Sequence, residues 1–181
     1  TERRTLAFDA MRFAREVHSG QVRKYTGNPY SDHLAEVCGI AMSAGWHNAE
    51  IHPDKLMATC WLHDSIEDQG VNPEEIRRQF GDEVAMGVLA LSDLEDGNRA
   101  ERKAASRARL AKAPSWVQTI KVADLISNTS SIVQHDPKFA VLYLEEKRLL
   151  LDVLDKADPR LMQVARDKPP KLSWMRARAL A

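Results

Sequence analysis

The sequence has few cysteines and no surplus of charge of either sign. Lysine and arginine together number 26, as do aspartate and glutamate, so the formal net charge is zero. A broad nucleic-acid-binding surface depends on surplus positive charge, so we expect no nucleic-acid partner. The two cysteines, Cys38 and Cys60, each follow an apolar stripe and form no CxxC pair. This pattern predicts buried free thiols in a reducing compartment rather than a disulfide.

Long apolar runs are also missing. No stretch of the chain approaches the ~20 consecutive apolar residues that a membrane-spanning helix needs. The first residues, TERRTLAFDAMRF, lack the hydrophobic segment of a secretion signal. We therefore expect a cytoplasmic protein with no membrane partner.

The chain shows no convincing strand pattern and no internal repeat, and its apolar residues instead recur at helical spacing. Its 181 residues suit one domain. We predict an all-α fold, a single helical bundle of roughly eight to ten helices. The expected helices cover residues 3–19, 31–44, 53–64, 73–79, 82–95, 99–112, 115–133, 137–156 and 159–167.

The end of the chain differs in character from the rest. We expect a domain over residues 1–168 and a C-terminal tail over residues 169–181, because two consecutive prolines at the start of the tail stop the preceding helix. Trp174 and Met175 in the tail could dock on the body of the protein or on another subunit of a homo-oligomer. Disorder of the tail is the alternative.

Four ionisable residues lie close together in the string WLHDSIEDQG: His63, Asp64, Glu67 and Asp68. At helical spacing, His63 shares a face with Glu67, and Asp64 shares a face with Asp68. The apolar residues before them place this region against a core, where ionised side chains need partners. The pattern therefore indicates either a metal site or a solvated helix end, where charged residues are common.

Two further residues that can bind a metal occur on helical faces that are otherwise apolar. Asp124 follows an apolar stripe and needs a cation, which either Lys121 or a metal ion could supply. His33 lies near the start of an apolar helix, where a histidine by itself is more often hydrogen-bonded than a ligand. Together with His63 and Asp64, these residues offer two imidazoles and two carboxylates. Such a set suits Mn²⁺, Fe²⁺, Mg²⁺ or Zn²⁺.

The order of these residues, a His, then a His-Asp doublet, then a lone Asp, resembles the HD-domain metal-dependent phosphohydrolases. The segments HSGQVRKYTGNPYSDH, LHDSIED and KVADLISNTSS further resemble the hydrolase domain of the RelA/SpoT family of alarmone enzymes. The resemblance covers about residues 5–160 in order. The chain departs from the family pattern at Leu34, where proline is usual, and at Ser131, where threonine is common.

This resemblance implies a stand-alone small hydrolase that removes pyrophosphate from the 3′ position of a guanosine alarmone, (p)ppGpp, and gives GDP or GTP. It implies one divalent ion, Mn²⁺ by expectation, with other divalent ions left open. The implied metal ligands are His33, His63, Asp64 and Asp124. Glu67 and Asp68 match the catalytic acidic pair of the family, which can accept a proton from the attacking water. The alternative is that this pair only orients His63 or a water molecule.

A guanosine polyphosphate also needs contacts beyond the metal. The candidate substrate-binding residues are Arg23, Lys24, Lys103, Lys121, Asn128 and Ser131. The first two precede His33 in a glycine-containing loop, and the last three follow the helical face of Asp124 at positions −3, +4 and +7. Lys103 belongs to a basic helix and to an ERK string similar to that of metazoan-type small hydrolases. An ordinary solvated charge or polar face is the alternative for each of them.

Two other functions stay open on the sequence. One is a phosphohydrolase that acts on NADPH, an adenosine alarmone or a nucleoside monophosphate, because the metal chemistry is shared and fold does not settle substrate. The other is a non-catalytic nucleotide-binding module, against which the intact His, Asp and Glu set argues.

Overall fold

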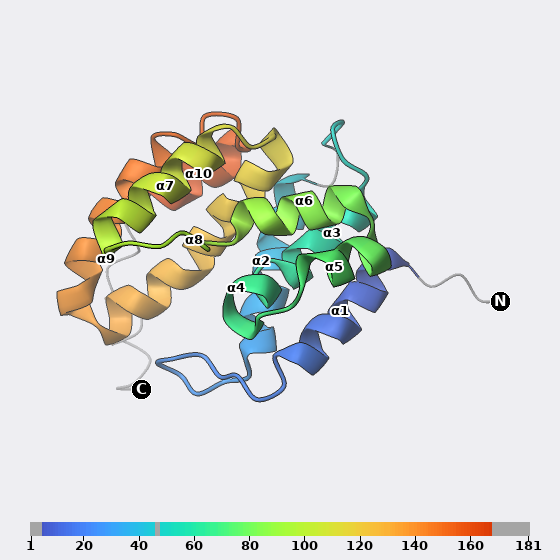
Figure 1. Ribbon diagram of the computed structural model, residues 1–181. Coiled ribbons are helices and arrows are strands. Elements are labelled where there is room, and N and C mark those ends of the chain that lie inside the picture. The colour runs from blue at the N-terminus through green and yellow to red at the C-terminus, as the bar shows by residue number, and fades with distance from the viewer. Residues whose placement is uncertain (1–4, 46–47, 168–181) are drawn as a thin grey trace, which may run out of the picture.

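The computed structural model describes residues 5–45 and 48–167 and shows a bundle of α-helices (Figure 1). Within these ranges it has ten helices and no strand, as the sequence predicts, and an isolated bridge joins Val22 to Pro29. The helices are α1 (Leu6–Val17), α2 (Tyr30–Gly45), α3 (Pro53–Leu62), α4 (Ser65–Gln69), α5 (Pro73–Phe80), α6 (Asp82–Leu91), α7 (Arg99–Ala111), α8 (Ser115–His135), α9 (Pro137–Leu151) and α10 (Pro159–Arg166).

The helix expected over residues 53–64 ends close to its predicted boundary, and a short helix that the sequence does not predict follows it. α3 ends at Leu62, α4 begins at Ser65, and Asp64 between them has φ −100° and ψ 0°. Because the chain turns at His63 and Asp64, the helical spacing expected between His63 and Glu67 does not continue across this segment. Asp64 accepts a hydrogen bond from the Tyr30 hydroxyl on α2, a long-range contact that helical spacing cannot anticipate.

Local side-chain caps determine where some helices begin. Asn72 Oδ1 accepts from the Glu74 backbone N–H at 2.9 Å, and Pro73 occupies the first turn of α5. At the start of α7, Asn98 Oδ1 accepts from the Glu101 N–H, and the Glu101 carboxylate accepts from the Asn98 N–H. These caps satisfy amide groups that have no partner inside the helix. The local sequence therefore defines the beginning of α7, the helix with the basic residues.

Two apolar cores meet at α3. One contains residues of α1, α3, α5 and α6, and the other surrounds α8 with residues of α2, α3 and α10. α8 is the central helix, because more than half of its 21 residues are buried and it packs against α2, α6, α7, α9 and α10. Asp124 lies in the middle of this helix and is 7% exposed. The fold thus carries a carboxylate into the interior.

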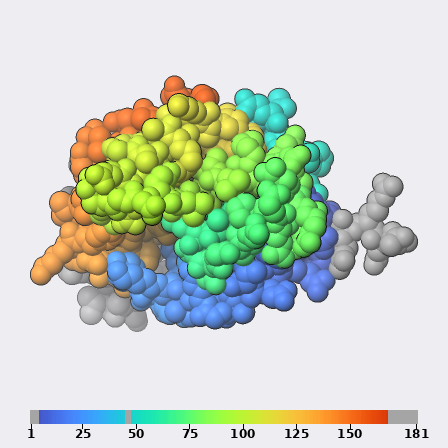
Figure 2. Space-filling model, viewed as in Figure 1, coloured from blue at the N-terminus to red at the C-terminus, as the bar shows by residue number. Residues whose placement is uncertain are grey.

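α7 forms part of the outer wall of the molecule. On the face in Figure 2, its yellow-green surface lies beside the green surface of α4–α6, with the orange surface of α9 at its other edge. α7 packs against both α8 and α9. The basic residues of α7 are consequently close to the buried part of α8.

Three other expectations concern cysteines, membranes and the tail. Cys38 and Cys60 are buried free thiols, as predicted. Across residues 5–45 and 48–167, no helix is both long enough and apolar enough to cross a membrane. The expected tail, residues 169–181, lies outside the described residues, so its boundary with a domain over residues 1–168 stays a prediction.

Gly87 of α6 marks the closest approach between three helices. A Cβ atom added at Gly87 would lie 2.5 Å from Trp116 Cη2 in α8 and 3.0 Å from Thr59 Cγ2 in α3. Trp116 is itself buried and cannot easily move aside. We expect Gly87→Ala to lower the free energy of unfolding by about 1–3 kcal/mol, the usual cost of overpacking, as measured by urea denaturation.

Gly39→Ala in α2 is the matched control for this experiment. Gly39 is exposed, and an added Cβ would meet no atom within 4 Å. Alanine there should raise the free energy of unfolding by about 0.4–1 kcal/mol, because it restricts the unfolded chain and favours the helix. Similar effects at both positions would contradict the close packing at Gly87.

Candidate active site

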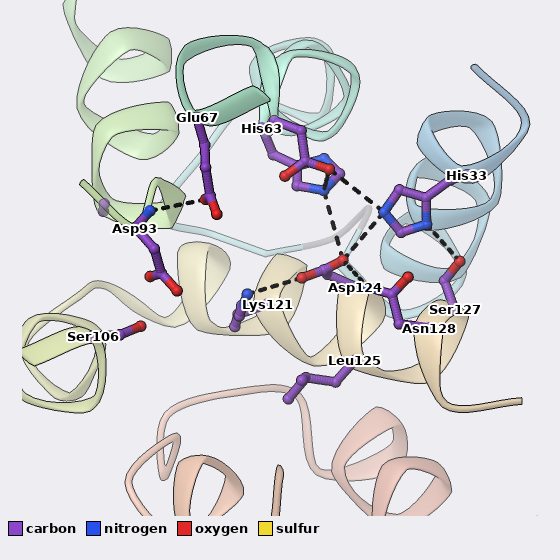
Figure 3. A network of polar contacts seen from close by, with 12 residues as sticks. His33, His63, Glu67, Asp93, Ser106, Lys121, Asp124, Leu125, Ser127 and Asn128 are labelled. Atoms are coloured by element: carbon purple, nitrogen blue, oxygen red, sulfur yellow. Dashed lines mark hydrogen bonds and ion pairs between the residues drawn. The ribbon is translucent and has the colours of Figure 1, made fainter. Parts of the chain in front are cut away.

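Two histidines and two aspartates from three segments converge in the interior (Figure 3). His33 comes from α2, His63 and Asp64 from the junction of α3 with α4, and Asp124 from α8. His63 Nε2 lies 2.9 Å from Asp64 Oδ2 and 3.7 Å from Asp124 Oδ1. His33 Nε2 lies 3.6 Å and 3.2 Å from the same two oxygens. Residues far apart in the sequence therefore present four donor atoms to one another.

The spacing of these atoms suits a metal ion. Ligands ~2.1 Å from one ion stand ~3.0–3.5 Å apart in octahedral or tetrahedral geometry, and the four distances in the cluster fall close to that range. His33 Nε2 and His63 Nε2 are buried without a hydrogen-bond partner among the described residues. His33, His63 and Asp64 form a group that could hold a metal ion. The donor set thus fits a divalent cation, with Asp124 beside it.

The other ring nitrogens hold both imidazoles in place. His63 Nδ1 lies 2.7 Å from the Cys60 carbonyl oxygen. A carbonyl can only accept, so Nδ1 carries the proton and Nε2 keeps a lone pair directed at the cluster. His33 Nδ1 lies 2.9 Å from Ser127 Oγ. The surrounding protein therefore orients the two nitrogens that could bind a metal.

Charges within the cluster favour ionised carboxylates. Burial opposes ionisation of Asp64, but His63 and His33 hold its pKa well below the usual range. Burial also opposes a charge on His63, yet Asp64 and Asp124 raise its pKa well above the ordinary value. The cluster consequently favours positive charge between the carboxylates, which either protons or a divalent cation can supply.

Asp124 has partners on both sides. Its Oδ2 accepts from Lys121 Nζ at 2.9 Å, and its Oδ1 accepts from Asn128 Nδ2 at 2.9 Å while also facing the two histidines. The ion pair with Lys121 and the approach to a metal cluster, which the sequence presents as alternatives, therefore coexist. Each uses a different carboxylate oxygen.

Glu67 lies beside the cluster in a hollow of the surface. Its Oε2 accepts from the Asp93 backbone N–H at 2.9 Å. Desolvation among the pocket walls, together with the charges of Asp93 and Asp64, raises the pKa of Glu67 to about 7 despite this hydrogen bond. The side chain remains exposed, so solvent screens part of the effect. A carboxyl with a pKa near neutrality suits proton exchange at ordinary pH.

Asp68 is held by a network that the sequence analysis missed. Gln21 Nε2 donates to Asp68 Oδ2 at 2.9 Å, while Gln21 Oε1 accepts from Gln69 Nε2 at 2.6 Å and lies 2.6 Å from His18 Nδ1. An ionised carboxylate only accepts, so these contacts fix the orientation of the Gln21 amide. The sequence signal was weak, because glutamines near a loop usually face solvent.

A pocket of about 250 Å³ opens over the cluster, and both acidic and basic side chains line it. Its acidic residues are Asp64, Glu67, Asp68, Asp93, Asp124 and Glu146. Its basic residues are Arg99, Lys103, Arg107, Lys121 and Lys147, of which three lie on α7. Lys103, a candidate substrate-binding residue, lines the pocket and pairs with Asp93 at 3.4 Å.

The other predicted substrate contacts are divided between two places. Lys121 and Asn128 line the pocket, whereas Ser131 lines a separate polar hollow of about 300 Å³ together with Arg23. The Arg23 guanidinium lies 3.4 Å from both Ser127 Oγ and Asn128 Oδ1. The expectation that Ser131 stands beside the cluster with Lys121 and Asn128 is thus not met.

Lys24 and Tyr30 also differ from the sequence-based assignment. Lys24 is exposed, its ammonium lies 5.2 Å from the centre of the Tyr25 ring, and it lines neither hollow. Tyr30, which has no predicted role, donates from its hydroxyl to Asp64 Oδ2 at 2.7 Å and lines the pocket. Its place three residues before His33 could have indicated this contact, because both residues begin the same helix.

Solved structures share this fold. A metazoan ortholog of SpoT that hydrolyzes ppGpp has a TM-score of 0.79 and 23% identity, over 100% of this chain and 99% of that one. A crystal structure from Listeria monocytogenes has a TM-score of 0.63 and 24% identity, over 79% of this chain and 95% of that one. These likenesses establish the helical architecture.

Relatives identify the family. MESH1 of Xenopus tropicalis, a guanosine-3′,5′-bis(diphosphate) 3′-pyrophosphohydrolase, is 30% identical over 137 residues, or 74% of this chain and 73% of that protein. The GTP pyrophosphokinase of Streptomyces coelicolor is 36% identical over 124 residues, or 66% of this chain but 14% of that protein. The chain thus spans only a small part of such long relatives. A model of the HD domain matches residues 10–138, and this chain belongs to the HD domain family as a homologue of MESH1 proteins.

Proposed function

We propose that this protein is a Mn²⁺-dependent guanosine-3′,5′-bis(diphosphate) 3′-pyrophosphohydrolase, which converts (p)ppGpp to GDP or GTP and pyrophosphate. The observation that carries the proposal is the convergence of His33, His63, Asp64 and Asp124 beneath a pocket that also contains basic residues. Homology to MESH1 proteins, which are named for this reaction, supports the substrate.

His33, His63, Asp64 and Asp124 would hold the ion, and nitrogen and oxygen donors without a thiolate suit Mn²⁺. When bound, a divalent cation makes water more acidic and offsets negative charge on the phosphoryl oxygens. Lys121 keeps Asp124 ionised, and Cys60 and Ser127 keep the imidazoles oriented.

Glu67 and Asp68 act on the water that attacks phosphorus. One of these carboxylates accepts a proton as the water oxygen bonds to phosphorus and the bond from phosphorus to the ribose 3′ oxygen breaks. The proton then passes to the ribose 3′ oxygen, which leaves with the bonding electrons and becomes the 3′-hydroxyl of the product. Gln21 holds Asp68, and the Asp93 N–H holds Glu67. Both carboxylates therefore keep a fixed position while one oxygen of each stays free of these contacts.

The remaining parts of the nucleotide meet the basic residues and the polar hollow. Lys103 and Lys121 contribute positive charge to the pocket for phosphate groups. The base or ribose contacts Arg23, Asn128 and Ser131. Arg23 lines the polar hollow with Ser131 and lies within 3.4 Å of Asn128 Oδ1, which lines the pocket, so the three side chains can meet one nucleotide. Lys24 acts from the loop surface as an additional charge. A cytoplasmic location and assembly as a homo-oligomer remain predictions.

The first test of this function is metal dependence with a panel of nucleotides. Chelation should abolish hydrolysis of guanosine 3′,5′-bis(diphosphate), Mn²⁺ should restore it, and Asp124→Asn should abolish it because an amide leaves the cation without its counter-charge. The panel should include adenosine alarmones, NADPH and nucleoside monophosphates. Faster turnover of one of these compounds would redirect the substrate assignment, and full activity without a bound ion would refute the metal site.

Ser127 offers a test of imidazole orientation. Ser127→Ala removes the partner of His33 Nδ1, so we expect Mn²⁺ affinity to fall by about 10- to 100-fold, as measured by calorimetry. Ser130→Ala is the matched control, because Ser130 is exposed on the same helix and lies outside the cluster. Equal affinities for the two variants would show that Ser127 does not orient the ligand.

Glu67 is expected to govern the pH dependence of turnover. Only its carboxylate form accepts a proton, and its pKa is raised to about 7, so turnover should increase as the pH rises through 7. Glu67→Gln cannot titrate, so it should lose this limb of the pH profile and about 10²–10⁴ of the rate. Glu16→Gln, at an exposed position on α1, is the control. An unchanged limb in Glu67→Gln would assign the titration to another group.

A further inference from the structure

Two basic side chains that line the pocket have no counter-ion among the described residues. Of the five basic residues that line it, Arg99 pairs with Glu146 at 2.7 Å, Lys103 with Asp93 at 3.4 Å, and Lys121 with Asp124 at 2.9 Å. The other two basic residues are Arg107 and Lys147. Within residues 5–45 and 48–167, neither side chain makes a hydrogen bond or an ion pair. Their charge is therefore available to a ligand.

Lys147 gives the stronger indication of a bound anion, because its side chain is buried and only 7% of the residue is exposed. A lysine is almost never this buried without a carboxylate or another acceptor, since removing the ammonium from water is costly. Burial alone, with no opposing charge, lowers the pKa of Lys147 to about 8. An anion bound in the pocket would stabilise the charged form of Lys147, which burial destabilises.

The second side of Lys147 offers no such partner. There it borders a hollow that Leu144, Leu151 and Ala165 line together with Arg148, Arg166 and Asp167. Asp167 accepts from the Gln163 side chain at 2.9 Å and makes no ion pair with Lys147. Arg148 and Arg166 pair with Asp152 on this side, and no described carboxylate there pairs with Lys147. The pocket, where the substrate binds in the proposed function, is therefore the side on which the ammonium meets an anion.

Arg107 and Lys147 occupy helices that pack against each other, α7 and α9 (Figure 1). Arg107 continues the face of α7 that carries Arg99 and Lys103, at spacings of eight and four residues. Lys147 follows Tyr143 by one turn on the pocket face of α9. The unpaired cations thus lie on the α7 and α9 side, whereas the carboxylates nearest the histidines belong to α8 and to the junction of α3 with α4.

We propose that Arg107 and Lys147 form an anion subsite that binds the phosphate groups of the substrate that are not hydrolysed. The inference rests on the proposed function, in which the 3′-diphosphate binds beside the two histidines and two aspartates. The 5′-diphosphate then binds Arg107 and Lys147.

The test compares two substrates that differ only in the 5′ group. Guanosine 3′,5′-bis(diphosphate) has a 5′-diphosphate, and guanosine 3′-diphosphate has none. Lys147→Met keeps the length of the side chain and removes its charge, while Lys138→Met makes the same change at an exposed position of α9. Assays at pH 7 keep Lys147 largely charged.

We expect Lys147→Met to lower kcat/KM by about tenfold or more for the bis(diphosphate), the usual worth of a charge-assisted hydrogen bond, and by less than about twofold for guanosine 3′-diphosphate. Lys138→Met should change neither value. An equal loss on both substrates, or no loss on either, would overturn the subsite. If circular dichroism shows that Lys147→Met does not fold, Arg107→Gln carries the same comparison, because Arg107 is only half-buried.

A second measurement separates the subsite from the proposed function. Lys147 can be acetylated near pH 8 and the modification followed by mass spectrometry, in the presence of GDP or of guanosine. Protection of Lys147 by GDP but not by guanosine supports the subsite even if the wild-type protein hydrolyses neither substrate, an outcome that would reject only the proposed function. Equal modification with GDP and with guanosine would overturn the subsite.

Discussion

The need for positive charge between the buried carboxylate of Asp124 and the largely buried carboxylate of Asp64 organises this structure. Asp64 and Asp124 lie where the two apolar cores meet, and each would be costly there if it were alone. His33 and His63 face both of them, and Lys121 completes the neutralisation of Asp124. A divalent cation bound by the same atoms would serve this requirement and supply the charge that phosphoryl hydrolysis needs.

The break between α3 and α4 makes this arrangement available. Asp64 lies outside both helices, so its carboxylate can reach Tyr30 and the imidazole of His33 on α2. The short helix after the break then places Glu67 and Asp68 in the pocket above the cluster. Asp64, at the turn, therefore faces the histidines in the interior, whereas Glu67 and Asp68, on α4, face the pocket and can exchange protons with water.

Local charge, rather than total charge, defines what the pocket can bind. The protein has no net charge, yet the pocket combines a carboxylate-rich region around Asp124 with the basic faces of α7 and α9. A metal ion and a polyphosphate can occupy such a pocket together, because each opposes the charge of its own region. Within the described part of the chain, the side chains of Arg107 and Lys147 line this pocket without a paired carboxylate.

The sequence by itself determined the all-α fold and the start of α7, because apolar periodicity and side-chain caps act within a few residues. Motif spacing also selected the two histidines and two aspartates that converge. Only the tertiary structure decided that the short helix α4 follows the turn at Asp64, that Ser131 faces a different hollow and that Lys147 is buried. The string EEKR that contains Lys147 resembles a solvated helical face. Contacts between distant segments override that local pattern, because burial depends on which helices pack together and not on neighbours in the chain.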